Sequence, residues 1–257
     1  MSDVLIIGCG VVGNNLLKEL SVLTPDVVDK YKKEKTTKKK EKYKFGFVCV
    51  DTPYDKEKEL FDTSEVVNAM DENDCEIYVV KSTVPIGFVN SIGKENVVFS
   101  PEYYGGTQHC NNFRFDFTIL GGCEKTCDKV IQLLQKVYDG RHRFLKMKSQ
   151  EAEMVKLMEN CFLATKVSFC NSFYEMCEKY NCSYESVREG FILDERCGSS
   201  HTFVYEDKPY WDSHCLNKDT VCAAIQGNDF MKGIICYNNA KKENKIFSKT
   251  LDKSETM

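Results

Sequence analysis

The chain begins with an apolar stretch, Val4–Ile7, that runs without a break into the pattern G-C-G-V-V-G at residues 8–13. Leucines recur at helical spacing just afterwards, so the glycines stand between a predicted strand and a predicted helix. In that context the first glycine makes a tight turn, the second lets the backbone approach a pyrophosphate, and the third lets the helix pack closely on the sheet. A glycine turn that binds nothing is the alternative. We predict a dinucleotide-binding unit whose cofactor contacts are Gly8, Gly10, Val11, Val12 and Gly13.

An acid ends the next predicted strand. Asp29 lies 21 residues after Gly8, at the position where a carboxylate can hold ribose hydroxyls. Because an acid there repels the additional phosphate of NADP, the sequence predicts NAD as the cofactor. The run that follows, residues 30–44, is dominated by lysine and has no apolar periodicity, which predicts a solvated loop. A basic patch for a phosphate-bearing partner is the alternative for this run.

Strands and helices alternate through the first part of the chain. Buried strands are expected at residues 45–50, 76–80, 96–99 and 117–120, with helices at 63–70 and 123–138. Polar residues follow the carboxyl ends of the strands, in D-T-P at 51–53, K-S-T-V-P-I-G at 81–87 and S-P-E-Y-Y at 100–104. This order predicts an α/β fold: a Rossmann-like, doubly wound parallel sheet with a ligand crevice at the carboxyl ends of its strands.

The pattern changes near residue 148. Residues 150–180 form one long helical pattern, and further helices are expected at 183–191 and near Asp219, with an irregular loop at 195–213. The polar tail from Lys241 is expected to fray. We therefore predict two domains, an NAD-binding domain at residues 1–148 and an all-helical domain at residues 149–257.

Composition argues against several classes of function. With 42% hydrophobic residues, a formal charge of −4 and a pI of about 5.7, the chain is expected to fold and not to bind nucleic acid. It has no apolar run long enough for a membrane and no export signal, so we expect a soluble, cytoplasmic protein. Its 14 cysteines are then expected to be reduced thiols. No second pair matches Cys123 and Cys127, so no metal is expected.

Three groups of residues can carry chemistry. Thr83 and Glu102 are expected at the mouth of the crevice, where a hydroxyl and a carboxylate can orient and activate water. Lys156 and Asn160, four residues apart, share one helix face. Cys215 lies in S-H-C-L-N-K-D-T at residues 213–220, and a helix capped by Asp219 would favour its thiolate. Taken alone, this last stretch is better explained by a buried thiol.

In sequence order these motifs resemble those of the UDP-glucose/GDP-mannose dehydrogenase family. GCGVVG, FVCVDTP, VVKSTVPIG, SPEYYGG, EAEMVKLMENCFLA, LDERCG and CLNKD are similar to the family's G-x-G-x-V-G, strand ending in T-P, K-S-T-V-P-x-G, N-P-E-F, A-E-x-x-K-x-x-x-N-x-F-L-A, D-x-R-I-G and C-F-x-K-D. The resemblance covers about residues 4–224. The resemblance implies a shortened UDP-glucose 6-dehydrogenase-like enzyme that uses two NAD molecules to oxidise the C6 alcohol of a nucleotide sugar to a carboxylate.

The resemblance also implies roles for the matching residues. Cys215 corresponds to the nucleophile that captures the aldehyde, and Lys156 and Asn160 correspond to a pair that stabilises oxyanions. Asp219 and Glu102 correspond to carboxylates of proton transfer or water activation, with Thr83 placing the water. The helix over residues 151–179 corresponds to the family's central helix, which implies a homodimer. The implied cofactor contacts also include Asp29, Thr52, Pro53, Thr83 and Lys218, and the implied substrate contacts are Glu102, Tyr103, Tyr104, Lys156 and Asn160.

The sequence departs from the family pattern in four places. The family's chains continue into a second Rossmann-like domain for the nucleotide part of the substrate, which we expect to be missing here. Bulky residues at 210–214, Y-W-D-S-H, replace a glycine-rich run before the cysteine and are expected to fill or reshape the space beside the sugar. The second glutamate of N-P-E-F-L-x-E-G is absent, and Phe88 replaces the threonine after V-P-x-G. The lysine-rich run replaces about one strand–helix unit.

Two other functions fit the same residues. A catalytically degenerate homologue would bind NAD and act as a binding or scaffold protein, pairing with a longer relative through the central helix. A hydroxyacid-type dehydrogenase would use a helix lysine for acid–base chemistry and leave Cys215 incidental. The joint presence of six residues with matching chemistry favours the catalytic interpretation: Glu102, Lys156, Asn160, Cys215, Lys218 and Asp219.

Overall fold

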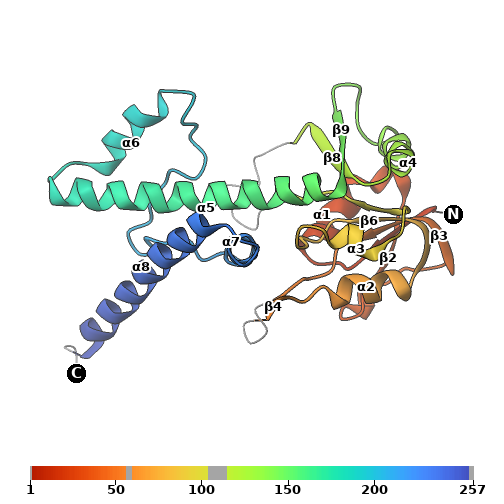
Figure 1. Ribbon diagram of the computed structural model, residues 1–257, viewed down its shortest axis with the longest axis horizontal. Coiled ribbons are helices and arrows are strands. Elements are labelled where there is room, and N and C mark those ends of the chain that lie inside the picture. Colours follow the sequence, from red (N-terminus) through yellow and green to blue (C-terminus); the bar gives the residue numbers. More distant parts are fainter. Residues whose placement is uncertain (1, 56–59, 104–114, 255–257) are drawn as a thin grey trace. The chain divides into compact units, whose positions relative to one another are not determined.

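The computed structural model in Figure 1 describes residues 2–55, 60–103 and 115–254. The contacts within the chain divide it into two compact units, Met1–Lys156 and Leu157–Met257. The division falls inside the long helix α5 (Ser149–Lys179), which begins next to the change of pattern near residue 148. Each unit has a hydrophobic cluster of its own.

The first unit is built on a seven-stranded sheet with the order β2-β1-β3-β6-β7-β8-β9 among the described residues. Neighbouring strands are parallel except β7 and β8, which pair antiparallel, so the predicted doubly wound sheet is present but is not parallel throughout. The order reverses at β1, which lies between β2 and β3, and in such sheets ligands bind beyond the carboxyl ends of the strands at this point. The strands are β1 (Val4–Ile7), β2 (Asp26–Val28), β3 (Lys42–Val48), β6 (Asp74–Val80), β7 (Val97–Phe99), β8 (Phe117–Gly121) and β9 (Arg143–Met147).

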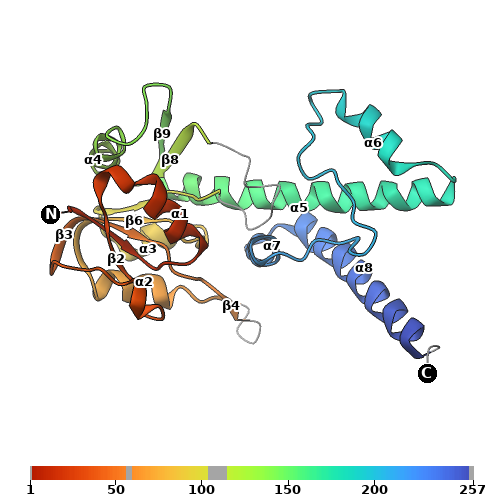
Figure 2. The same cartoon turned by 180° about the vertical axis from the view of Figure 1, so that it is seen from behind.

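Successive side chains of β1 point to opposite faces of the sheet and pack into two hydrophobic cores, one on each face. Val4 and Ile6 belong to the core that also takes residues of α1 (Val11–Glu19) and α4 (Glu124–Leu134). Leu5 and Ile7 belong to the other core, with residues of α2 (Ser64–Asp71), α3 (Phe88–Ile92) and the first turn of α5. Figures 1 and 2 show helices on both faces of the sheet. The sequence patterns missed α3, β9 and the short hairpin of β4 (Tyr54–Asp55) and β5 (Leu60–Phe61).

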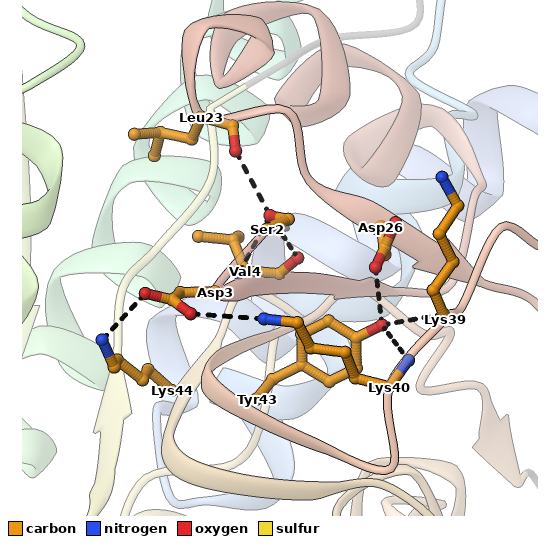
Figure 3. A network of polar contacts seen from close by, with 9 residues as sticks. All are labelled: Ser2, Asp3, Val4, Leu23, Asp26, Lys39, Lys40, Tyr43 and Lys44. Atoms are coloured by element: carbon orange, nitrogen blue, oxygen red, sulfur yellow. Dashed lines mark hydrogen bonds and ion pairs between the residues drawn. The ribbon is translucent and has the colours of Figure 1, made fainter.

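The lysine-rich run is anchored to the sheet at its second half. It contains a single turn of 3₁₀ helix, η2 (Lys33–Lys35), after the similar turn η1 (Ser21–Leu23) that follows α1. The buried Tyr43 hydroxyl donates to Asp26 Oδ2 at 2.7 Å and accepts from the backbone N–H groups of Lys39 and Lys40 (Figure 3). Burial and the neighbouring Asp26 raise the pKa of Tyr43. Residues 30–41 are mostly exposed, as predicted, but the solvated loop expected to reach residue 44 ends earlier, because residues 42–44 belong to β3 and Tyr43 is buried.

The second unit is helical. It contains most of α5, then α6 (Tyr184–Ile192), α7 (His214–Ile225) and α8 (Asp229–Ser254), with an irregular segment at residues 195–213. Its hydrophobic cluster joins Cys161 of α5 to Ala223 and Ala224 of α7 and to Met231 of α8. Among the described residues, no helix combines the length and apolarity needed to cross a bilayer.

Two predictions for this unit were wrong. The helix expected near Asp219 begins five residues earlier, at His214, because Ser213 caps it: Ser213 Oγ accepts from the Leu216 N–H at 3.2 Å. The tail expected to fray from Lys241 continues α8 as far as Ser254. Its composition allows this, because lysine, glutamate and leucine are good helix formers.

Candidate active site

The three fingerprint glycines meet different surroundings. Gly8 has φ +92°, and a Cβ there would lie 2.7 Å from the Cys49 carbonyl oxygen, so both conformation and space require glycine. A Cβ on Gly13 would overlap the Gly8 carbonyl oxygen. At Gly10 nothing lies within 4 Å of the Cβ position. The first and third glycines therefore hold helix and strand together, while the second leaves open space beside the backbone.

The N-terminus of α1 adjoins that open space. Gly10 occupies the N-cap position and provides no side-chain cap. Asn14 Nδ2 donates to the carbonyl oxygens of Cys9 and Gly10, each at 2.6 Å, which fixes the loop without covering the N–H groups of the first turn. Those N–H groups, on Val11, Val12 and Gly13, are the donors that a helix leaves for an anion. The loop therefore fits a dinucleotide pyrophosphate.

Asp29 lies where β2 ends and is bound to the glycine loop. Its Oδ2 accepts from the Cys9 N–H at 2.6 Å, and its Oδ1 accepts from the N–H groups of Tyr31 at 2.9 Å and Lys32 at 2.7 Å. Burial raises the pKa of Asp29, but these backbone hydrogen bonds outweigh burial and hold the pKa below its usual value. The carboxylate is charged at neutral pH, and Oδ2, which accepts a single hydrogen bond from the backbone, retains a second lone pair for a ribose hydroxyl.

The crevice segments after β3 and β6 are joined to each other. Thr52 Oγ1 donates to the Thr83 carbonyl oxygen at 2.7 Å, and Ser82 Oγ donates to the Val50 carbonyl oxygen at 2.6 Å. Thr52 is buried, whereas Pro53 is exposed. The Thr83 side chain is half-buried on the same segment. The two motifs predicted to contribute cofactor contacts thus form one connected surface.

Glu102 pairs with Lys81, which was not among the predicted site residues. Lys81 Nζ lies 3.1 Å from Glu102 Oε2 and donates to Ser100 Oγ at 3.2 Å. Both charged side chains are largely buried, at 9% and 12% exposure, so the pair is shielded from water. Lys81 could have been found from its place in K-S-T-V-P-I-G, since it follows a buried strand directly.

The first turns of α5 contribute two more groups to this unit. Lys156 is buried, with its ammonium 5.2 Å from the centre of the Tyr103 ring, a cation–π contact. Glu153 is fully buried and accepts from the N–H groups of Gly87 at 2.5 Å and Val89 at 2.9 Å, so it ties α5 to the end of the Thr83 segment. Glu153 was not among the predicted site residues, although it lies between Glu151 and Lys156 in the family motif. Tyr104 lies outside the described residues.

In the second unit, three predicted residues form one buried cluster. Asp219, fully buried in α7, accepts from Asn160 Nδ2 at 2.5 Å through Oδ2. Its Oδ1 pairs with Lys218 Nζ at 3.1 Å. Lys218 and Asn160 are themselves buried, at 9% and 6% exposure. A carboxylate so deeply buried is stable only with such partners, and here α5 and α7 supply them. The ammonium group of Lys218, a residue predicted to contact the cofactor, therefore forms an ion pair with Asp219.

Cys215 is in the first turn of α7 and is exposed. The prediction that it precedes the helix was wrong by one turn, because Ser213 and not Asp219 is the cap. A thiol in a first turn faces the positive end of the helix dipole and the N–H groups that the helix leaves unbonded, both of which favour a thiolate. Cys215 and Asp219 lie one turn apart on the same helix.

Several other cysteines have the opposite environment. Burial is the main cause that raises the pKa of Cys161 to about 11 and of Cys222 to about 12, and the nearby Asp219 acts in the same direction. Burial likewise raises the pKa of Cys75 to about 12 and of Cys127 to about 11. These residues are neutral thiols that pack as small apolar groups, as the composition predicted.

Comparison with known proteins supports the resemblance. Residues 150–242 match the model of the UDP-glucose/GDP-mannose dehydrogenase family, central domain. A UDP-glucose 6-dehydrogenase of Campylobacter jejuni is 29% identical over 214 residues, which cover 77% of this chain and 53% of that protein. A UDP-glucose 6-dehydrogenase of Bacillus subtilis is 31% identical over 182 residues, covering 63% and 40%. The chain spans about half the length of the curated relatives it matches.

Solved structures extend the similarity to the fold. A UDP-glucose dehydrogenase from Pyrobaculum islandicum superposes with a TM-score of 0.76 at 22% identity, over 93% of this chain and 68% of that one. A GDP-mannose dehydrogenase from Pseudomonas aeruginosa superposes with a TM-score of 0.62 at 19% identity, over 93% and 69%.

A Rossmann-type sheet with a glycine fingerprint, followed by a helical unit, gives this chain the fold of the solved nucleotide-sugar dehydrogenases. Residues 150–242 match the central domain of the UDP-glucose/GDP-mannose dehydrogenase family, and similarity to UDP-glucose 6-dehydrogenases extends over most of the chain.

Proposed function

We propose that this chain catalyses the NAD-dependent oxidation of the C6 alcohol of a UDP-glucose-type nucleotide sugar to the carboxylate, through a covalent intermediate on Cys215. The observation that supports this most strongly is the buried cluster of Asn160, Lys218 and Asp219 in the unit that carries the exposed Cys215. Taking a charged pair out of water costs free energy that the attraction between the charges does not always repay, and buried ionisable groups are concentrated at functional sites.

Cys215 acts as the nucleophile. The first oxidation removes a hydride and a proton from the alcohol and yields an aldehyde. The Cys215 sulfur adds to the aldehyde carbon, and the oxygen takes a proton, giving a thiohemiacetal. A second loss of hydride and proton gives a thioester, and water then displaces the thiol to release the carboxylate. Asp219, one turn from Cys215, is suited to exchange protons in these steps.

The remaining polar residues stabilise charge and position water. Lys156 and Asn160 are proposed to donate to the substrate oxygen as it becomes anionic, which is the function of an oxyanion site. Glu102, which forms an ion pair with Lys81, is proposed to activate the hydrolytic water that Thr83 positions. Glu102, Tyr103, Lys156 and Asn160 are also proposed substrate contacts, together with Tyr104.

The first unit is proposed to bind NAD. The glycine loop would hold the pyrophosphate and Asp29 the ribose hydroxyls, while Thr52, Pro53, Thr83 and Lys218 would contact the rest of the cofactor. When bound, NAD takes the hydride in each oxidation. We keep the division of roles expected from the sequence, with NAD binding at residues 1–148 and the cysteine helix within residues 149–257.

We further propose that the protein acts in the cytoplasm as a homodimer through α5. Large apolar side chains recur along this helix at spacings of four, seven, four and three residues and are exposed by 40% to 71%. An apolar stripe of this length is costly to leave in water, and a second copy of the same helix fits it. The stripe consists of Met158, Phe162, Phe169, Phe173 and Met176.

The test measures NADH formation by the purified chain with NAD and a panel of nucleotide sugars, beginning with UDP-glucose. We expect two NADH per sugar, loss of turnover in Cys215→Ser, and unchanged NAD affinity in that variant. Cys182→Ser, at another exposed cysteine, is the matched control and should behave as the unchanged chain. One NADH per sugar, unaffected by Cys215→Ser, would favour a hydroxyacid-type dehydrogenase. NAD binding without NADH from any sugar would favour the catalytically degenerate homologue.

A further inference from the structure

The segment before Cys215 is bulky where the family pattern is glycine-rich, and the structure shows where the largest of its side chains goes. Trp211 is buried, with 6% exposure, inside the helical unit. Its indole Nε1–H donates to Ser168 Oγ of α5 at 2.9 Å. Ser168 is itself buried, at 4% exposure. The tryptophan therefore anchors the segment to α5 through a hydrogen bond that is shielded from water.

The backbone of Trp211 is held from a second helix. Asn238 of α8 accepts from the Trp211 N–H through Oδ1 at 2.9 Å and donates from Nδ2 to the Trp211 carbonyl oxygen at 3.0 Å. Asn238 is 3% exposed. One amide thus satisfies both backbone groups of one residue, as a neighbouring strand would. We refer to Ser168, Trp211 and Asn238 as the Trp211 clamp.

Asp212 and Ser213, which follow Trp211, connect it to α7 through further side-chain contacts. Asp212 Oδ1 accepts from Asn217 Nδ2 at 2.7 Å, and its Oδ2 pairs with Lys242 Nζ of α8 at 3.0 Å. Ser213 then caps α7 at Leu216. Trp211, Asp212 and Ser213 each make at least one side-chain hydrogen bond, and the thiol follows two residues after the cap.

We propose that the Trp211 clamp is a positioning device for Cys215: it fixes the start of α7, so that the thiol is always presented from a fully formed first turn. Glycines permit close approach of the backbone but leave it mobile. The clamp replaces that freedom with contacts to α5 and α8. This inference rests on the role of Cys215 in the proposed function, and Trp211, Ser168 and Asn238 act through the cysteine without touching the substrate.

Removing a hydrogen bond of the Trp211 clamp should lower the thiolate population of Cys215 even in a variant that still folds. A frayed first turn no longer aligns its N–H groups and dipole with the sulfur, and such interactions change an equilibrium by roughly twofold to fivefold. The thiolate population of Cys215 near neutral pH should fall accordingly. Exposed cysteines elsewhere in the same unit should keep their reactivity.

The experiment measures the alkylation rate of Cys215 by iodoacetamide against pH, with site-resolved mass spectrometry of the full chain. Ser168→Ala removes the acceptor of the indole N–H, and Asn238→Ala removes both backbone contacts. Each should lower the neutral-pH rate roughly threefold and move the profile to higher pH. Asn239→Ala, at the exposed neighbouring asparagine of α8, is the matched control. Cys182, also exposed, is the internal reference.

The proposal is overturned if both variants fold and alkylate Cys215 with the unchanged profile, or if Cys182 shifts by the same factor. If Asn238→Ala does not fold, Ser168→Ala decides alone, since it removes one oxygen atom. Turnover separates the two proposals. If the chain forms no NADH but the alkylation profile of Cys215 still shifts in the variants, the positioning role of the Trp211 clamp stands and the proposed enzymatic function is rejected. If the chain is active, both variants should have a lower kcat and an unchanged KM.

Discussion

Two segments of this chain prepare a site by opposite means. The glycine loop at residues 8–13 does so by lacking side chains: Gly8 and Gly13 stand where any Cβ would strike backbone. The segment at residues 211–213 does so by using side chains, with the buried Trp211 held from α5 and α8. The first segment is sensitive to added atoms and the second to removed atoms. Mutations that add or delete small groups should therefore distinguish the two.

Trp211→Ala should have the largest effect. Deleting a buried tryptophan leaves a cavity and abandons the hydrogen bond to Ser168, and such truncations cost about 3–5 kcal/mol of unfolding free energy. Urea unfolding followed by circular dichroism measures this, since Trp211 is the chain's only tryptophan and fluorescence would be lost with it. Tyr205→Ala, at an aromatic residue of the same loop that is 50% exposed, should cost under about 0.5 kcal/mol. Equal losses would show that Trp211 is not an anchor.

Gly13→Ala should have the next largest effect and Gly10→Ala a much smaller one. The new methyl at position 13 would overlap the Gly8 carbonyl oxygen, and overpacking of this kind costs about 1–3 kcal/mol. At position 10 the methyl enters open space, so stability should hold while NAD binding weakens. Thermal unfolding and NAD titration of both variants separate these outcomes. A Gly10→Ala variant less stable than Gly13→Ala would contradict the account of the loop.

The same contrast explains how much could be predicted from sequence. The glycine loop was predicted correctly because the requirement for glycine is local: strand, turn and helix adjoin within residues 4–20. The start of α7 was misplaced because the prediction used Asp219 as the cap, whereas Ser213 caps the helix and the buried Asp219 accepts from Asn160, 59 residues away in sequence. The partners of Trp211 are likewise 43 and 27 residues distant, and no periodicity reports them.

The candidate site divides in the same way. Motif positions identified Glu102, Asn160, Lys218 and Asp219, and the structure joins the last three. Lys81 was missed because a lysine after a strand is ordinarily solvated, and only its burial beside Glu102 gives it a role. Residue type and order therefore specify which groups matter, whereas tertiary packing specifies which of them are paired.

The Asp29 carboxylate also stabilises the glycine loop, by accepting from the Cys9 N–H. The variant Asp29→Asn tests this contribution. Because backbone hydrogen bonds hold the pKa of Asp29 below its ordinary value of 3.8, its contribution to stability is fully present above that value and is lost as pH falls through the lower folded value. The variant should be less stable by roughly 1.5 kcal/mol at neutral pH. Thermal unfolding from neutral to strongly acidic pH should show the difference shrinking below pH 3.8. A pH-independent difference would mean that Asp29 acts by shape alone.

Asp212→Asn should have the smallest effect, although Asp212 supports the cysteine segment as Asp29 supports the loop. The hydrogen bond from Asn217 and then the contact with Lys242 lower its pKa, so its contribution is likewise lost in acid. Its side chain is 31% exposed, however, and water and salt screen such a pair, which limits the cost to roughly 0.5 kcal/mol. Thermal unfolding in low and high salt should show that the cost largely disappears in salt. A cost that equals that of Asp29→Asn and resists salt would mean that the hydrogen bond from Asn217 to Asp212, and not the buried tryptophan, holds the start of α7.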